Sequence, residues 1–139
     1  MALNHMTMNF TSDEFKSQEA DVLRAMTENE APYLVHCLEG KDRTGFICML
    51  LEAFEGAGYQ ELADDYMITY DNYYHISEAS DKERYDGLIE SLLHPMLREL
   101  TGKDADLENA DYAECARRYI REIGLTDAEI SKLHACLEG

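Results

Sequence analysis

Residues 36–45, which read His-Cys-Leu-Glu-Gly-Lys-Asp-Arg-Thr-Gly, restrict the fold of this chain more than any other segment. The apolar residues just before it predict a short buried strand at 33–36. The apolar run after it, 46–54, predicts a buried helix, because its large apolar residues recur at helical spacing. A strand, a tight turn and a helix in this order direct the backbone N–H groups of the turn and the positive end of the helix toward one point. We therefore expect an anion site there, and phosphate is the usual occupant of such a site.

The residue types in this segment suit nucleophilic attack on phosphorus. A thiolate is a strong nucleophile, and converging amides, the helix N-terminus and the Arg43 guanidinium would favour the anionic form of Cys37. Arg43 can also hold two phosphate oxygens in a planar fork. Gly40 allows a tight turn with no Cβ near the ligand. Thr44 can donate a hydrogen bond to the sulfur, and His36 would orient the loop through hydrogen bonds.

The pattern His-Cys-x5-Arg-Thr at 36–44 resembles the signature loop of the cysteine-dependent protein tyrosine phosphatases. The fuller Gly-Lys-Asp-Arg-Thr-Gly at 40–45 is similar to a bacterial subgroup related to the secreted mycobacterial tyrosine phosphatase B. Weaker matches at 63–69 and 119–133 extend the resemblance from about residue 10 to the C-terminus. The resemblance implies an α/β fold of the phosphotyrosine phosphatase II type, in which helices flank a sheet.

The resemblance also implies a role for each loop residue. Cys37 would be the nucleophile that forms a phosphocysteine, Arg43 the phosphate clamp and Asp42 the general acid. Lys41 adds a second cation, a feature shared with phosphatases that act on inositol lipids. Glu39 departs from the small or neutral residue of many relatives, and its carboxylate would repel a dianion unless a cation pairs with it. The complete phosphate-binding loop would be Cys37, Leu38, Glu39, Gly40, Lys41, Asp42 and Arg43, supported by His36 and Thr44.

The function expected from these residues is hydrolysis of phosphoric monoesters by a protein tyrosine phosphatase through a phosphocysteine intermediate. The substrate would be a phosphorylated protein, with phosphoserine, phosphothreonine and phosphoinositides as further substrates. Phosphate or sulfate would occupy the loop, and neither a cofactor nor a metal would be needed. The alternative is a catalytically incomplete phosphate-binding fragment or subunit that needs a partner chain to complete the fold.

The alternative arises because the sequence contains one convincing strand, at 33–36, and a single strand has no partners for its backbone groups. Residues 13–30 predict a helix, and Thr11 with Glu14 has the capping-box pattern at its start. We therefore expect residues 10–139 to be the C-terminal part of a phosphatase-like domain, after an irregular or cloning-derived lead at 1–9. The other strands would come from a second copy in an intertwined homo-oligomer or from a missing N-terminal half.

The rest of the chain predicts helices, so this chain should be mostly α-helical. They are expected at 60–74, 81–100 and 109–123, with a kink or break at Pro95, and a last helix opened by a capping box of Thr126 and Glu129. A set of tyrosines at helical spacing is typical of a core face, although it could also line a substrate pocket. This set is Tyr66, Tyr70, Tyr73 and Tyr74.

Composition excludes several partners. The formal net charge of −17 and the pI near 4.4 argue against binding to nucleic acid or to anionic membrane surfaces. The sequence has no transmembrane run and no secretory segment, and four cysteines without framework spacing suit a reducing compartment. These features predict a cytoplasmic protein, and secretion stays open if the natural N-terminus is missing.

The other cysteines and the histidines predict no site of their own. Three cysteines fall on apolar helical faces and are expected in the core, although a disulfide from Cys37 to one of them is conceivable. These three are Cys48, Cys115 and Cys136, and three histidines, His75, His94 and His134, do not pair with cysteines at metal-ligand spacing. We therefore expect no zinc site.

Overall fold

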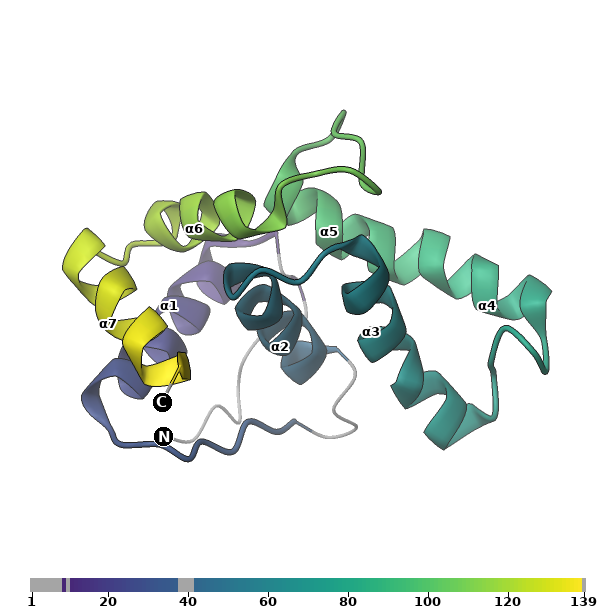
Figure 1. Ribbon diagram of the computed structural model, residues 1–139, viewed down its shortest axis with the longest axis horizontal. Helices are drawn as coiled ribbons and strands as arrows, with labels where there is room; N and C mark the ends of the chain where they lie inside the picture. Colours follow the sequence, from purple (N-terminus) through teal and green to yellow (C-terminus); the bar gives the residue numbers. More distant parts are fainter. Residues whose placement is uncertain (1–8, 10, 38–41, 139) are drawn as a thin grey trace.

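The computed structural model describes residues 9, 11–37 and 42–138, and within them the chain is helical (Figure 1). The helices follow the order of the predicted helical segments. They are α1 (Asp13–Glu28), α2 (Arg43–Phe54), α3 (Tyr59–Tyr74), α4 (Lys82–Leu88), the π-helical segment η1 (Ile89–Leu93), α5 (His94–Thr101), α6 (Tyr112–Glu122) and α7 (Asp127–Glu138).

Helix α2 is the central element of the core. It packs against α6 and α3, while α1 packs against α7 and α5 against α6 (Figure 1). Its apolar residues point in several directions, and a helix of this kind has to be covered on more than one side. Phe46 is fully buried, and the rings of Phe15 and Tyr119 pack against it edge-on at centroid distances of 5.4 and 6.0 Å. The loop helix predicted at 46–54 is therefore confirmed, and it begins three residues earlier.

The strand predicted at 33–36 is wrong for the part of the chain that the structure describes. Residues 32–37 have no regular secondary structure, and no strand occurs among the described residues to pair with them. Tyr33 and Val35 pack against the core while Leu34 between them is 87 % exposed. Alternation of this kind is the side-chain pattern of a strand, but a strand also needs a ladder of backbone hydrogen bonds. The sheet that the family resemblance implies is therefore not seen in these residues.

The two predicted capping boxes have different outcomes. The one at the start of α1 is wrong, because Ser12 is the N-cap and its Oγ accepts a hydrogen bond of 3.1 Å from the Phe15 N–H. The one at α7 is confirmed: the Thr126 N–H donates to Glu129 Oε1 at 3.0 Å, and the Glu129 N–H donates to Thr126 Oγ1 at 3.2 Å. Both helices begin where a local side chain satisfies a free backbone donor.

Pro95 changes the helical geometry without breaking the rod that α4, η1 and α5 form together (Figure 1). A proline inside an α-helix has no N–H, and its ring collides with the carbonyl four residues earlier. Here the preceding turn widens into η1, where the His94 N–H donates to the Ile89 carbonyl five residues back. The wider turn makes room for the proline ring, so the predicted kink is a π-helical turn.

The remaining predictions about the core hold in part. Tyr66 and Tyr70 are buried, whereas Tyr73 and Tyr74 are exposed, so only half of the tyrosine set is core. The cysteines that were expected in the core are half-buried and form no disulfide among the described residues. None of the described helices has both the length and the apolar character that a membrane span requires.

Candidate functional site

Of the predicted loop residues, Asp42, Arg43 and Thr44 lie at the N-terminus of α2. Cys37 ends the extended segment, Asp42 is the N-cap of α2, and Arg43 is its first residue. Leu38, Glu39, Gly40 and Lys41 lie outside the described residues. The Asp42 carbonyl accepts the Phe46 N–H at 2.8 Å, which starts the helix. A helix of 12 residues that begins at this point has its positive end at Asp42 and Arg43.

Arg43 and Thr44 carry polar atoms that are buried without a partner in the described part of the chain. These atoms are Arg43 Nε and Thr44 Oγ1, and both belong to the first turn of α2. A buried guanidinium N–H without an acceptor is costly, so proteins rarely keep one unless a ligand, ion or water supplies the acceptor. The first-turn amides of α2 are donors as well. The N-terminus of α2 therefore has the donor set of an anion site.

A cavity of about 200 Å³ lies beside Arg43, between α1, the start of α2 and the rod formed by η1 and α5. Asp42 and Arg43 are on its wall, so it adjoins the donors described above. The rest of its wall is mostly apolar and comprises Phe15, Ser91, Leu92, Pro95 and Met96. A polar edge and an apolar interior suit a ligand that has an anionic head and an apolar body.

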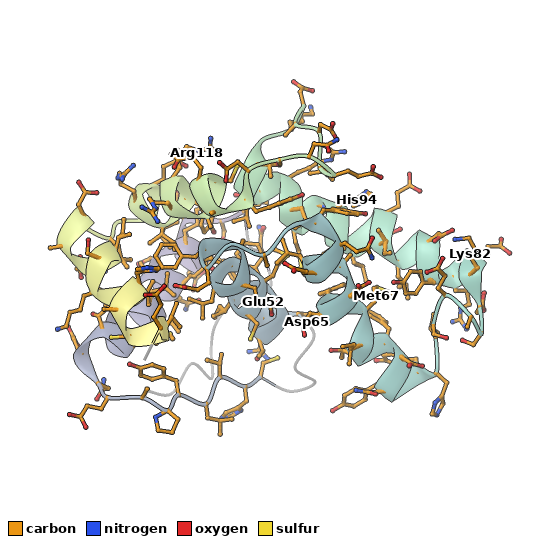
Figure 2. The ribbon with its side chains drawn as sticks, in the orientation of Figure 1. Glu52, Asp65, Met67, Lys82, His94 and Arg118 are labelled. Carbon is orange, nitrogen blue, oxygen red and sulfur yellow. The ribbon has the colours of Figure 1, made fainter. Side chains whose placement is uncertain are left out.

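A smaller cavity of about 80 Å³ lies on the side of α2 that faces α3. Glu52 of α2 and Asp65 of α3 lie on its wall, and Figure 2 shows their positions on the two neighbouring helices. Burial, a hydrogen bond with Asp65 and the charge of Asp65 together raise the pKa of Glu52 to about 7. Part of the Glu52 population therefore holds a proton at neutral pH, because burial and a neighbouring carboxylate both disfavour its charged form.

A second thiol, that of Cys48, lies on the wall of the same smaller cavity. Burial raises the pKa of the Cys48 thiol, and the charges of Glu52, Asp65 and Cys37 act in the same direction. A protonated thiol is a poor nucleophile. Cys48 is therefore suited to packing rather than to nucleophilic attack.

Tyr66 is the tyrosine of the predicted set that lies closest to this chemistry. Burial raises its pKa well above the usual range, Tyr70 adds to the rise, and the charge of Asp42 contributes. The hydroxyls of Tyr66 and Tyr70 are 3.5 Å apart. Tyr66 therefore stays a neutral hydroxyl on the wall of the smaller cavity, and the exposed Tyr73 and Tyr74 lie further along α3.

The structure brings most of the described candidates together and adds residues that sequence reasoning missed. Asp42, Arg43 and Thr44 lie at the start of α2, Cys37 is near enough to Cys48 of the same helix for its charge to act on that thiol, and His36 is exposed. The missed residues form the apolar wall of the larger cavity. They come from α1 and from the η1–α5 rod, and they are Phe15, Leu92, Pro95 and Met96. The sequence carried one signal for it, Pro95 within a helical pattern, but nothing local indicated which surface that turn would face.

The comparisons with known proteins agree with the chemistry of this site. A family model described as "Tyrosine phosphatase family" matches residues 2–138. The chain therefore belongs to the tyrosine phosphatase family, which is a family of phosphoric monoester hydrolases. Neither the curated proteins nor the solved structures contain a match. The narrower likeness to the subgroup related to mycobacterial tyrosine phosphatase B stays a prediction.

Proposed function

We propose that this chain is a cysteine-dependent protein tyrosine phosphatase. The observation that carries the proposal is the buried Nε of Arg43, which has no partner among the described residues and lies at the N-terminus of α2, six positions after Cys37. Family membership supports phosphatase activity in general. The proposal adds the nucleophile, the clamp and the acid, together with phosphoserine, phosphothreonine and phosphoinositides as substrates beyond phosphotyrosine.

The proposed reaction has two steps. The Cys37 thiolate attacks phosphorus and forms an S–P bond, the ester P–O bond breaks, and the leaving oxygen takes a proton from Asp42. Water then attacks the phosphocysteine and gives a proton to the Asp42 carboxylate, and the S–P bond breaks. Inorganic phosphate leaves, and the Cys37 thiolate and protonated Asp42 are restored. Arg43 and the start of α2 stabilise the charge on the equatorial oxygens in both steps. Leu38, Glu39, Gly40 and Lys41 would supply further loop contacts, with His36 and Thr44 as supporting residues.

Asp42 suits the role of general acid because of where it stands. It is the N-cap residue of α2 and directly precedes Arg43 in the chain. It lies on the wall of the larger cavity next to Arg43, where the ester oxygen of a substrate clamped by Arg43 would be within reach. A proton delivered from this side would reach the leaving group directly.

The direct test is hydrolysis of para-nitrophenyl phosphate by the purified chain in the presence of a reductant and a metal chelator. We expect turnover that orthovanadate inhibits competitively, because vanadate would occupy the anion site. Hydrolysis that needs an added metal, or that persists after alkylation of the thiols, would contradict the proposed mechanism.

Arg43→Lys should reduce kcat/KM by about 10²–10³-fold, because lysine is a point charge and cannot hold two phosphate oxygens in a planar fork. The measurement is steady-state kinetics with para-nitrophenyl phosphate, together with the inhibition constant of orthovanadate. The exposed Arg84→Lys on α4 is the matched control and should leave both quantities unchanged. Unchanged kinetics in Arg43→Lys would remove Arg43 as the clamp.

Asp42→Asn should slow substrates with poor leaving groups more than activated ones. We expect a loss of about 10²-fold with phenyl phosphate and of less than about 10-fold with para-nitrophenyl phosphate, since a good leaving group needs no proton. The measurement is the ratio of kcat with phenyl phosphate to kcat with para-nitrophenyl phosphate, compared between wild-type protein and Asp42→Asn. Equal slowing of both substrates would show that another residue is the acid.

A second candidate function is the phosphate-binding subunit that needs a partner chain. The extended segment at 32–37, for which the described residues offer no strand partner, and the exposed Leu34 favour it, because the segment that enters a phosphate loop is expected to lie in a sheet. In this proposal residues 10–139 are the C-terminal part of the domain, and a second copy or an N-terminal half supplies the sheet. Sedimentation velocity with the activity assay separates the two: an active monomer contradicts this candidate, and an active oligomer supports it.

A further inference from the structure

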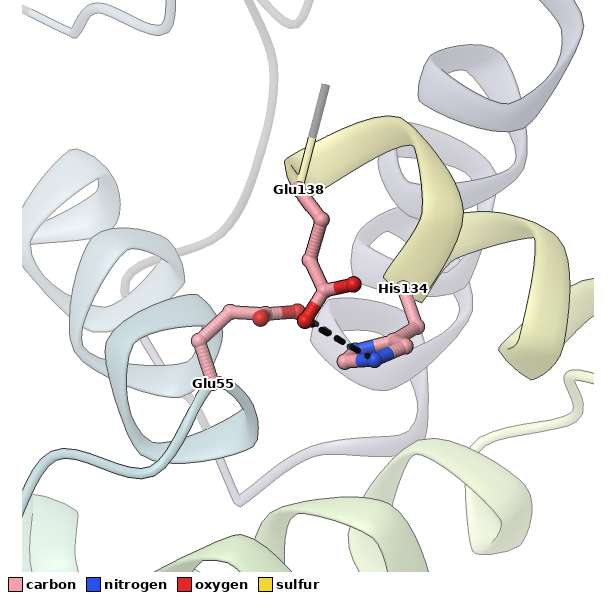
Figure 3. A group of neighbouring side chains, drawn as sticks. All are labelled: Glu55, His134 and Glu138. Carbon is pink, nitrogen blue, oxygen red and sulfur yellow. Dashed lines mark hydrogen bonds and ion pairs between the residues drawn. The ribbon is translucent and has the colours of Figure 1, made fainter.

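We propose that Glu55, His134 and Glu138 form a binding site for a borderline divalent cation such as Ni²⁺ or Zn²⁺. The three side chains point toward one another from the end of α2 and from α7 (Figure 3). His134 Nδ1 lies 3.0 Å from Glu55 Oε1, and His134 Nε2 lies 3.2 Å from Glu138 Oε1. One donor atom from each residue can be chosen so that all three lie within 4.8 Å of one another.

The hydrogen-bonding capacity of the imidazole is the first reason for a cation here. A carboxylate only accepts hydrogen bonds, and a neutral imidazole has one N–H. With a carboxylate oxygen at each ring nitrogen, neutral His134 can satisfy only one of its two contacts. The other nitrogen then faces an oxygen with its lone pair, and a bound cation between them turns that repulsion into two ligand bonds.

The ends of the two helices are the second reason. Glu55 is the C-cap of α2, and Glu138 is the last residue of α7. A helix carries partial negative charge at its C-terminus, where a cation is stabilising and a carboxylate is not. Neither helix has a basic residue in its last turn, so no lysine or arginine of these turns offsets the two acids. The net charge of −17 adds to the negative potential.

The side chains of this site are restrained by contacts within the protein itself. His134 and Glu138 are four residues apart on α7 and therefore share a helix face. The His134 ring packs edge-on against Phe54, with ring centroids 5.9 Å apart at 87°, so its orientation is restricted. Arg117 lies over the same Phe54 ring in a cation–π contact, with Cζ 5.7 Å from the ring centroid. The ligands are partly exposed, so an ion can enter and waters can complete its coordination.

The ligand types select the class of cation. One imidazole nitrogen and two carboxylate oxygens suit Zn²⁺, Ni²⁺ and similar ions, whereas Ca²⁺ and Mg²⁺ prefer oxygen ligands alone. One carboxylate oxygen lies at each ring nitrogen of His134, and one donor atom from each residue lies within 4.8 Å of the others. A small rotation of the side chains would bring both carboxylates to an ion held about 2.1 Å from one ring nitrogen. Metal binding would tie α7 to the end of α2 opposite the phosphate loop, and its role is therefore structural.

The test is binding of NiCl₂ to the full chain, measured by isothermal titration calorimetry and by the shift in Tm. We expect an ion bound at this site and, at a concentration about 100 times its Kd, a rise in Tm of roughly 5 °C or more. Glu138→Gln and His134→Gln should each weaken this binding by about 10-fold or more. Glu83→Gln, an exposed change of the same charge on α4, is the matched control and should bind as the wild type does.

Two outcomes would overturn the proposal. One is equal binding by wild-type protein, Glu138→Gln and His134→Gln, which would place the ion at another site, such as the cysteine thiols. The other is no Tm shift with metal while acidification stabilises the wild type more than Glu138→Gln, which would make a proton the group that joins the two carboxylates. Because the phosphatase assay is made in a chelator, this proposal and the proposed function can fail independently.

Discussion

Cys37→Ser is expected to lower kcat by about 10⁴-fold or more, because a serine hydroxyl is not ionised at neutral pH and cannot form the S–P bond of the intermediate. Binding of orthovanadate or phosphate should change by only a few fold, since Arg43 and the start of α2 keep their donors. The measurements are steady-state hydrolysis of para-nitrophenyl phosphate and calorimetric titration with phosphate. Rapid acid quench should trap a phosphorylated enzyme in the wild type and not in the variant.

Cys48→Ser is the matched control for this experiment. It makes the same chemical change in the wall of the smaller cavity, at a thiol whose raised pKa keeps it protonated. We expect kcat within a few fold of the wild type. If Cys48→Ser abolished turnover and Cys37→Ser did not, the assignment of the nucleophile would be wrong. If Cys37→Ser abolished phosphate binding as well, the residue would be a structural part of the loop.

The second large effect is expected at Glu19, a carboxyl group that is 0 % exposed in the core. Tyr119 of α6 donates a hydrogen bond of 2.8 Å to Glu19 Oε2, and Oε1 has no partner among the described residues. The pKa of Glu19 is raised to about 8, chiefly by burial; the Tyr119 hydrogen bond and the charge of Lys16 act against this rise, and the charge of Glu99 adds to it. At neutral pH the folded protein therefore holds a proton on Glu19.

Because of this proton on Glu19, the free energy of unfolding is expected to fall as the pH rises. An unfolded glutamate ionises near pH 4.3, and the folded one near pH 8, so folding takes up a proton between these values. The stability from protonated Glu19 is fully present below about pH 4.3 and is lost as the pH rises through about 8. At about 1.4 kcal/mol per pH unit, the loss between pH 5 and pH 8 is on the order of 3–4 kcal/mol.

Glu19→Gln should remove this dependence, because the amide is close in shape to the protonated acid and does not ionise. Urea unfolding from pH 5 to pH 9 measures the free energy of unfolding, and the wild type should fall relative to the variant across this range. Glu28→Gln, an exposed change at the end of the same helix, should run parallel to the wild type. Parallel curves for wild type and Glu19→Gln would show that Glu19 does not hold a proton in the fold.

The sequence by itself determined the features that depend on near neighbours in the chain. Helical spacing predicted α2, α3, α6 and α7, and the reciprocal pair of Thr126 and Glu129 predicted the start of α7, because caps and periodicity act over three or four residues. The segment 36–45 predicted the family in the same way, since its chemistry is contained in ten consecutive residues.

Only the tertiary structure decided which of these elements meet. The hydrogen bond between Glu19 and Tyr119 spans 100 positions, and the contact between Glu55 and His134 spans 79. Part of the apolar wall beside Arg43 comes from a π-helical turn, and no local sequence pattern indicated that this turn would face α2. The segment 32–37 shows the same limit: its alternation predicts a strand, but strand formation depends on backbone partners far away in the chain or in another molecule. Local spacing determined what each element is, and burial against distant elements determined what each residue can do.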